Sequence, residues 1–225
     1  PLNAIVGFSE LLVDCDDPDE KAEYWHIIES NNDLLLRLIN DILDLSKIES
    51  GIIDRKRERF NLTQLCNELY VMMRSKIPNA DVELVQDNPC SECWIFLDSN
   101  RLKQVWMNFL TNAVKYTKRG HVILKISYSR IDEENINLRI DVKDSGIGIQ
   151  KKDMENLFQN FTRLEEHKNR NIEGTGLGLS LTKRLVDMMH GEVQVESQYG
   201  EGSTFTAIIP QKVICEDGIG DMKQI

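Results

Sequence analysis

Residues 174–179 read Gly-Thr-Gly-Leu-Gly-Leu and run directly into an apolar helical pattern at residues 177–189. Closely spaced glycines let a backbone approach a ligand without obstruction by Cβ, and they readily adopt positive φ. The unpaired N–H groups and the dipole at a helix N-terminus attract phosphate. The stretch therefore predicts a cradle for a triphosphate. It is not a P-loop, because no Gly-Lys-Ser/Thr follows, and it lacks the acidic residue of a dinucleotide fingerprint.

Three further stretches fit the same ligand. Residues 144–148 (Asp-Ser-Gly-Ile-Gly) follow directly on a predicted strand, and residues 200–205 (Gly-Glu-Gly-Ser-Thr-Phe) begin another. Asn108 and Asn112 are four residues apart on one predicted helix and therefore share a face. The carboxylate of Asp144 can accept a hydrogen bond from an exocyclic amine such as that of adenine, and an Asn112 amide oxygen suits Mg²⁺.

Each of these features has a simpler explanation when it is taken alone. The glycines can serve turns, the two asparagines can be solvated, and Phe158 and Phe161 can belong to a core. Lys115, close after Asn112 on the same helix, can neutralise phosphate charge. The occurrence of all the features in one chain favours the ligand site.

The first 57 residues show helical periodicity without strand patterning. A first helix ends before Pro18, and a second is predicted from about Asp19 to Ser50, where Gly51 follows. A heptad seam on the second helix predicts a dimer interface, and its members are Ile28, Leu35, Leu38, Ile42 and Leu45. Two helices cannot bury so broad an apolar stripe, so two copies are predicted to form a four-helix bundle. The alternative is that the hairpin packs on the second domain of its own chain.

From Phe60 onward the hydrophobic period changes, and short strands alternate with helices. Helices are predicted at residues 62–73, 98–116 and 177–189, and strands at 82–85, 94–97, 122–126, 136–142, 192–196 and 204–209. The economical assembly is one mixed sheet with about three helices on one face, an α/β sandwich. The fold class is thus α+β, with a hairpin at residues 1–57, a sandwich at 58–212 and a tail or linker at 213–225.

The composition of the chain limits the kinds of partner that it is expected to bind. The chain of 225 residues carries a net charge of −10, which argues against non-specific binding to nucleic acid or to an anionic membrane surface. No apolar run approaches the roughly 20 residues that span a bilayer. A cytoplasmic location is therefore expected, with any inner-membrane anchor of the full-length protein upstream of Pro1.

The cysteines indicate a reducing compartment. There are five, an odd number without a disulfide framework. Cys90 and Cys93 form a single CxxC with no second pair at similar spacing, which argues against a structural zinc site. The pair is either two ordinary loop thiols or a redox sensor, and Glu92 between them favours the former.

In this order the stretches resemble the conserved boxes of sensor histidine kinases of two-component systems. Asn108-x-x-x-Asn112-Ala113-x-Lys115-Tyr116-Thr117 resembles the N box, and it is preceded by Asp98-x-x-Arg101-Leu102-x-Gln104-Val105. Residues 144–148 resemble the first glycine box, and residues 158–161 resemble the F box. Residues 174–179 resemble the second glycine box, and residues 202–205 resemble the third. Residues 1–5 resemble those that follow the family's phospho-accepting histidine. The resemblance covers roughly residues 1–210.

The resemblance implies a Bergerat-type ATP-binding domain joined to a dimerisation and histidine-phosphotransfer hairpin. Asn112 would hold Mg²⁺, Asp144 would read the adenine amine, and Thr204 would support that contact. Residues 148–174 would form a mobile lid in which Arg163 either contacts phosphate or is solvated. The nucleotide-binding set implied in this way is Asn108, Asn112, Lys115, Tyr116, Asp144, Gly146, Gly148, Arg163, Gly174, Thr175, Gly176, Leu177, Gly178, Leu179 and Thr204.

The activity implied is transfer of the γ-phosphoryl group of ATP to a histidine and then to an aspartate of a response regulator that docks on the bundle. The acceptor histidine is expected a few residues before Pro1, so this chain is expected to bind ATP without phosphorylating itself. The histidines present are not expected to replace the acceptor; they are His26, His121, His167 and His190.

Two alternatives share the same nucleotide fold. An ATPase of the gyrase or Hsp90 type carries a glutamate as general base one turn before its metal-binding asparagine. Here that position is Asn108, which cannot take a proton. The other alternative is a nucleotide-binding scaffold that transfers no phosphoryl group.

Overall fold

The computed structural model describes residues 1–51, 56–77, 81–88, 92–132, 135–160 and 175–212. The chain divides into two compact units, residues 1–53 with 160–181 and residues 54–159 with 182–225. The predictions for Cys90, Phe161, Arg163, His167 and Gly174, and for the tail at residues 213–225, lie outside the described residues.

The N-terminal residues form a helical hairpin, as predicted. Helix α1 spans Leu2–Asp14 and helix α2 spans Pro18–Glu49. Asp17 caps α2, because its side chain accepts a hydrogen bond from the backbone N–H of Asp19 at 2.8 Å. Pro18 follows in the first turn of the helix, where its missing N–H costs nothing. The rings of Phe8 and Tyr24 pack against each other with centroids 5.7 Å apart and so join the two helices.

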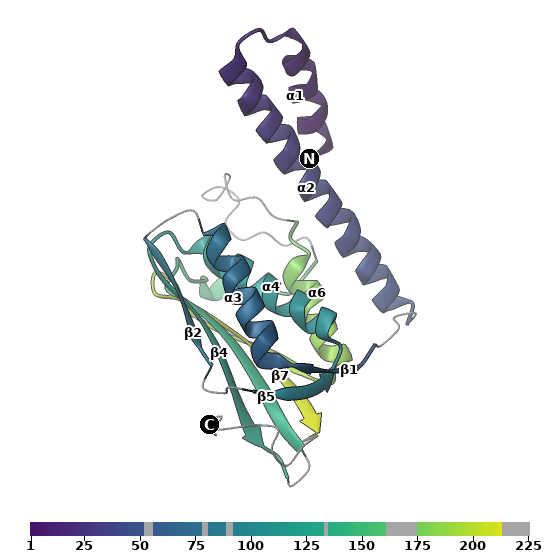
Figure 1. Ribbon diagram of the computed structural model, residues 1–225, viewed down its shortest axis with the longest axis vertical. Coiled ribbons are helices and arrows are strands. Elements are labelled where there is room, and N and C mark those ends of the chain that lie inside the picture. Colours follow the sequence, from purple (N-terminus) through teal and green to yellow (C-terminus); the bar gives the residue numbers. More distant parts are fainter. Residues whose placement is uncertain (52–55, 78–80, 89–91, 133–134, 161–174, 213–225) are drawn as a thin grey trace. The chain divides into compact units, whose positions relative to one another are not determined.

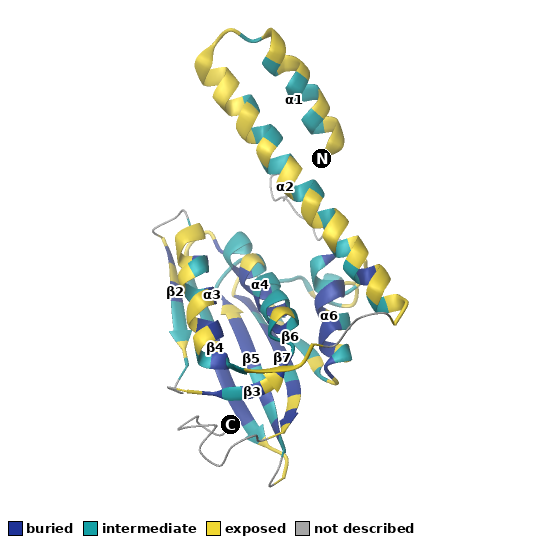
Figure 2. Ribbon diagram, turned by 45° about the vertical axis from the view of Figure 1, so that its right-hand side comes forward, coloured by how far each residue is buried: buried dark blue, intermediate teal, exposed yellow. Residues whose placement is uncertain are grey.

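The hairpin has almost no core of its own. Helix α1 contains no buried residue, and Leu45 is the only buried residue of α2. Figure 2 shows the hairpin almost entirely in the colours of exposed and intermediate residues. Its exposed large apolar side chains are Leu2, Val6, Leu11, Val13, Trp25, Leu36, Ile39, Ile42 and Leu43. Among the described residues, no helix is both long enough and apolar enough to cross a membrane.

The second unit is built on a five-stranded mixed sheet with the strand order β2-β4-β5-β7-β6. The strands are β2 (Val82–Asp87), β4 (Gly120–Arg130), β5 (Asn135–Asp144), β6 (Glu192–Gln198) and β7 (Gly202–Lys212). Strands β2 and β4 are parallel, and the other pairs are antiparallel. Helices α3 (Leu62–Lys76), α4 (Ser99–Tyr116) and α6 (Gly178–Met188, of which residues 182–188 belong to this unit) cover one face (Figure 1). The predicted sandwich of a mixed sheet with helices on one face is confirmed.

Alternation along the strands sets the core. In β5, Ile136, Leu138, Ile140 and Val142 are buried toward the helices, as the two-residue period of a strand requires. Their partners across the ladder in β7 include Phe205, which packs its ring 5.4 Å from that of Phe109 on α4. The sheet and the helices that cover it therefore enclose one apolar core between them (Figure 2).

One strand was assigned to the wrong sheet. Residues 94–97 form β3 (Trp94–Leu97), which pairs antiparallel with β1 (Glu58–Asn61) in a separate two-stranded sheet. Strand β1 was not predicted, because the sequence Glu-Arg-Phe-Asn is short and carries a single apolar residue. The four-residue helix α5 (Lys151–Met154) was also not predicted.

Candidate functional site

Asp144 is the last residue of β5 and lies almost entirely buried, with 4% of its surface exposed. One carboxylate oxygen, Oδ1, accepts hydrogen bonds from the backbone N–H groups of Gly146 at 2.8 Å and Ser203 at 3.3 Å. Because both bonds end on Oδ1, the carboxyl group is held in one orientation. None of the described residues donates to Oδ2, which can therefore accept a hydrogen bond from a ligand.

The environment of Asp144 disfavours its charge. Burial raises the pKa of the Asp144 carboxyl above its ordinary value, because the ionised form loses hydration. The N–H groups of Gly146 and Ser203, and His121 nearby, lower the pKa in the opposite direction without cancelling the effect of burial. A ligand that donates a further hydrogen bond to Oδ2 would therefore stabilise a carboxylate that is short of partners.

The C-terminal end of α4 lies beside Asp144. The N–H of Ile147 donates to the carbonyl oxygen of Tyr116 at 3.2 Å. A Cβ added at Gly146 would lie 2.9 Å from both Thr117 Oγ1 and Asp144 Oδ1, so these two oxygens border the same point. The Thr117 hydroxyl is buried and has no hydrogen-bond partner among the residues that the structure describes. A buried hydroxyl without a partner next to a buried carboxylate fits a site that a polar ligand or a water completes.

The strand register corrects the predicted role of Thr204. In the ladder Asp144 is opposite Ser203, whereas Thr204 is opposite Lys143. Successive side chains of a strand point to opposite faces, so Thr204 lies on the face of the sheet away from Asp144. Ser203 takes the place beside Asp144, and its hydroxyl lies 2.9 Å from that of Ser197. The prediction missed Ser203, although its shared parity with the core residue Phe205 could have identified it.

Two glycines let the first and third glycine stretches meet backbone to backbone. Gly148 has φ +66°, and a Cβ there would overlap the carbonyl oxygen of Gln198. Gly202 has φ +116°, and a Cβ there would overlap the carbonyl oxygen of Asp144. The N–H of Gly200 donates to the carbonyl oxygen of Ile147 at 2.8 Å. The turn before β7 and the loop after β5 are therefore one packed unit.

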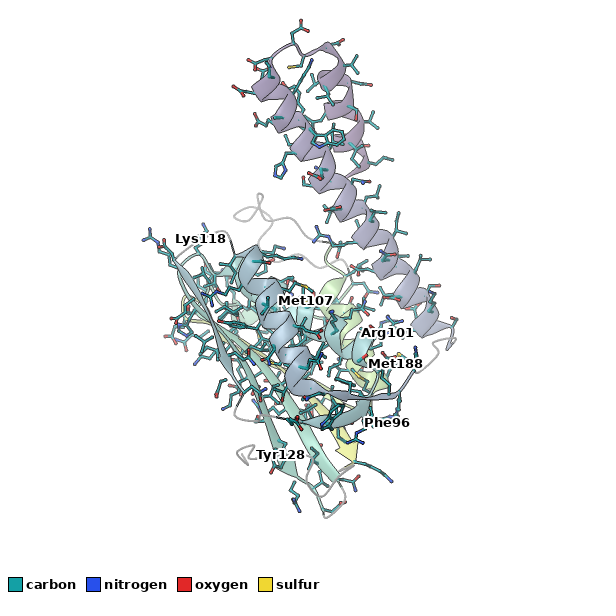
Figure 3. All side chains as sticks on the ribbon, in the orientation of Figure 1. Phe96, Arg101, Met107, Lys118, Tyr128 and Met188 are labelled. Carbon is teal, nitrogen blue, oxygen red and sulfur yellow. The ribbon has the colours of Figure 1, made fainter. Side chains whose placement is uncertain are left out.

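Helix α4 presents the two asparagines. Its N-cap is Asp98, as predicted, which accepts from the N–H of Arg101 at 3.1 Å. Figure 3 labels Arg101 in the first turn and Lys118 just beyond the last, and thus marks the two ends of the helix. Asn108 and Asn112 are half-buried on this helix, and Asn108 Nδ2 donates to Thr182 Oγ1 of α6 at 2.7 Å.

Lys115 and Tyr116 lie together at the C-terminal end of α4. The Lys115 ammonium group lies 4.9 Å from the centroid of the Tyr116 ring. The contact holds a positive charge at the end of the helix that carries Asn112 and adjoins Asp144. A charge at this position suits a bound phosphate.

The second glycine stretch has the local structure of a helix start. Gly176 has φ +72°, a conformation that favours glycine, and Leu177 is fully buried. Thr175 Oγ1 accepts a hydrogen bond from the N–H of Leu177 at 3.2 Å, and α6 begins at Gly178. Leu179 lies in its first turn. The stretch thus has the helix N-terminus that was predicted, with the polarity that favours phosphate.

The structure thus brings Asp144, Gly146, Ser203, Tyr116 and Thr117 to one place and links Asn108 to α6. Among the described residues, no group of three or more His, Cys, Asp or Glu side chains could hold a metal ion. A neutral amide oxygen such as that of Asn112, combined with phosphate oxygens, is the ligand set that suits Mg²⁺ brought in by a nucleotide.

Two family models match the chain. Residues 97–213 match the model described as histidine kinase-, DNA gyrase B-, and HSP90-like ATPase. Residues 1–51 match the His Kinase A (phospho-acceptor) domain. Together the two models cover both the hairpin and most of the sandwich.

Curated relatives align with nearly the whole chain. Hybrid signal transduction histidine kinase A of Dictyostelium discoideum is 38% identical over 218 residues, which is 93% of this chain and 10% of that protein. Sensor histidine kinase GacS of Pseudomonas protegens is 37% identical over 209 residues, which is 91% of this chain and 22% of that protein. The chain thus spans a quarter or less of the length of these relatives.

Solved structures give the same result. Full-length ShkA in complex with AMPPNP superposes with a TM-score of 0.73 at 27% identity, over 96% of this chain and 44% of that one. Histidine kinase ThkA in complex with the response regulator protein TrrA superposes with a TM-score of 0.69 at 25% identity, over 94% of this chain and 57% of that one. The chain belongs to the histidine kinase-, DNA gyrase B- and HSP90-like ATPase family and, within it, to the sensor histidine kinases.

Proposed function

We propose that this chain is the catalytic core of a two-component sensor histidine kinase that uses Mg²⁺-ATP to phosphorylate a histidine. The observation that carries the proposal is Asn108. A hydrolytic enzyme needs a base at this position to activate water. Asn108 is an amide, and its Nδ2 donates to Thr182 Oγ1 at 2.7 Å, so no proton acceptor stands there. Transfer to a protein nucleophile requires no such base.

In the proposed complex the adenine amine donates to Asp144 Oδ2. The Thr117 hydroxyl, buried and without a partner in the described part of the chain, borders the same point and is available to a water or to the base. Asn112 holds Mg²⁺, which supplies charge neutralisation to the phosphates when bound. Lys115 and Tyr116 take part of the remaining phosphate charge. The helix start at residues 175–179 has, on its own, the polarity that favours phosphate.

Once the nucleotide is bound, the protein mainly has to position the γ-phosphoryl group and the acceptor histidine. Phosphoryl transfer needs alignment of donor and acceptor and neutralisation of the phosphate charge more than covalent participation by the protein. A neutral imidazole near pH 7 is already a competent nucleophile, because its ordinary pKa is about 6.5. We place the acceptor histidine upstream of Pro1, and the final acceptor on an aspartate of a response regulator. The relative ThkA was solved with such a partner.

The test is the fate of the γ-phosphoryl group in a longer piece of the natural protein that includes the residues preceding Pro1. Protein-bound label from γ-labelled ATP is expected in the presence of Mg²⁺. Asn112→Ala should reduce the labelling rate at least about 100-fold, since the variant loses the ligand that orients the metal and the phosphates. Equal labelling of the variant and the unsubstituted protein would contradict the assignment of Asn112.

We propose that the hairpin forms a four-helix bundle with a second copy. Phe8 of α1 contacts Tyr24 of α2, which joins the two helices of one copy. In its C-terminal half α2 exposes Leu36, Ile39, Ile42 and Leu43. Apolar area of this extent on a helix is normally covered in solution.

Ile42→Asp is expected to weaken the dimer about 100-fold, because a symmetric interface takes the cost of a buried charge twice. Ile42 is 46% exposed in the single chain, so the substitution removes little from the fold of one copy. Sedimentation velocity across a range of protein concentrations would measure the shift from dimer to monomer.

Asn40→Asp is the matched control, since it adds the same charge two residues earlier on the opposite side of the helix. It should leave the dimer unchanged. A dimer that persists in Ile42→Asp, or an equal loss in both variants, would rule out this face of α2 as the interface.

A further inference from the structure

We propose that Thr182 is a positioning residue that holds the Asn108 amide with its carbonyl oxygen toward the Mg²⁺-nucleotide. The inference rests on the proposed function, because it concerns how the same site receives its metal. It assigns a task to a residue outside the predicted nucleotide-binding set.

The hydrogen bond between the two residues is short, and its Thr182 end is buried. Asn108 Nδ2 lies 2.7 Å from Thr182 Oγ1, and Thr182 is 2% exposed. The bond joins α4 to α6 across 74 residues of sequence. Because the Thr182 end of the bond is shielded from water, we expect the bond to hold its geometry.

Fixing one end of an amide fixes the other. The Asn side chain carries a donor NH₂ and an acceptor oxygen on the same planar group. Its terminal torsion is broad and roughly two-fold, so an amide without a partner presents either end with little preference. With NH₂ directed at Thr182, the oxygen must point away from α6. An oxygen attracts Mg²⁺, whereas an NH₂ group in the same place repels it.

The hydroxyl of Thr182 is not explained by packing. The buried residues of α6 around it are the apolar Leu181, Leu185 and Val186 and the polar Ser180, whose hydroxyl donates to the carbonyl oxygen of Leu177 at 2.9 Å. A valine would fill nearly the same space with the same β-branched preference for its rotamer. The hydroxyl is nevertheless present, and its partner is Asn108. Its task is therefore to orient a group on α4.

The test compares Thr182→Val with Thr182→Ser in the chain of residues 1–225. Calorimetric titration would measure ATP affinity with Mg²⁺ and with a chelator instead of Mg²⁺. Thr182→Val is expected to weaken Mg²⁺-ATP binding about tenfold, the usual loss when a residue that hydrogen-bonds to a metal ligand is removed. Binding of metal-free ATP should change by less than about twofold, because the phosphates and the adenine keep their own partners.

Thr182→Ser keeps the hydroxyl and should restore Mg²⁺-ATP binding to within about twofold of the original. Thr111→Val is the control on α4, the helix that carries Asn108. Thr111 is exposed, and its hydroxyl donates to the backbone carbonyl oxygen of Asn108 at 3.1 Å. This variant should bind as the unsubstituted chain does. Thermal melts of all the variants would identify a loss that arises from unfolding.

A second readout needs no nucleotide. The side-chain amide protons of Asn108, assigned by their disappearance in Asn108→Leu, should exchange slowly with solvent in the original chain and in Thr182→Ser, and rapidly in Thr182→Val. A chain that binds no Mg²⁺-ATP would overturn the proposed function. Mg²⁺-ATP binding that Thr182→Val leaves intact, or weakens equally without Mg²⁺, would overturn the role of Thr182 alone.

Discussion

Asp144→Asn is expected to lower the affinity of the chain for Mg²⁺-ATP by about 100-fold or more, the scale of a buried donor that meets another donor. The substituted side chain keeps Oδ1, which accepts from the N–H groups of Gly146 and Ser203. In place of Oδ2 it presents an NH₂ group, which cannot accept from the adenine amine. The substitution should therefore weaken recognition of the adenine base and leave the hydrogen bonds from Gly146 and Ser203 intact.

The same substitution should change the preferred base. Inosine triphosphate carries a carbonyl oxygen where adenosine triphosphate carries its amine, and the new NH₂ of Asp144→Asn can donate to that oxygen. The preference for ATP over ITP is expected to fall sharply in the variant. Calorimetric titration of both proteins with both nucleotides measures this ratio. An unchanged ATP affinity in the variant would show that Asp144 does not read the base.

The fold of Asp144→Asn should survive, and the sign of its effect follows from the pKa. Burial raises the pKa of Asp144, so the folded chain binds more protons than the unfolded chain between the ordinary and the raised value. The free energy of unfolding therefore falls as pH rises through that interval. At pH 7 the buried, ionised carboxylate lowers the free energy of unfolding, whereas a neutral asparagine does not. The thermal midpoint of the variant at pH 7 should equal or exceed that of the original chain.

Gly202→Ala is expected to destabilise the second unit by about 3 kcal/mol or more and to abolish nucleotide binding. Gly202 has φ +116°, and a Cβ there would overlap the carbonyl oxygen of Asp144 and lie 2.9 Å from the Cα of Ser145. These are backbone atoms, which cannot turn aside as a side chain does. The strand pair must separate where Asp144 is held, so stability and binding should be lost together.

Gly200→Ala is the control that separates the cost of a left-handed backbone from the cost of steric overlap at Gly202. Gly200 lies in the same turn at φ +89°, and nothing lies within 4 Å of a Cβ placed there. It should cost only about 1–2 kcal/mol, the penalty of a left-handed backbone for alanine. Urea unfolding of the two variants gives the comparison. Equal losses would show that contact with Asp144 is not what requires glycine at position 202.

The parts of the fold that depend on local signals were predicted well. Helix α4 and its Asp98 cap follow from short-range hydrogen bonding and a 3.6-residue apolar period. The strands of the β4–β5 hairpin follow from alternation that repeats on both sides of one turn. The hairpin of α1 and α2 follows from a break at Pro18 between two apolar periods. In each case the deciding interactions lie within a few residues of one another.

The features that were missed depend on partners distant in sequence. Strand β3 pairs with β1, which lies about 35 residues earlier in the sequence, and no local pattern in β1 indicates this pairing. The choice of Ser203 over Thr204 depends on a register of one residue against β5, which reverses the face of every side chain. Thr182 shows no signal in its own segment, because its buried hydroxyl has meaning only beside Asn108.

The measurement that tests the central claim most directly follows the γ-phosphoryl group of ATP in the longer piece of the natural protein, with protein label and free phosphate recorded together. The account predicts protein-bound label that acid removes and alkali leaves in place, the stability of a phosphohistidine, with little free phosphate. Free phosphate without protein label would contradict it, since a water rather than a histidine would then be the acceptor despite the amide at position 108.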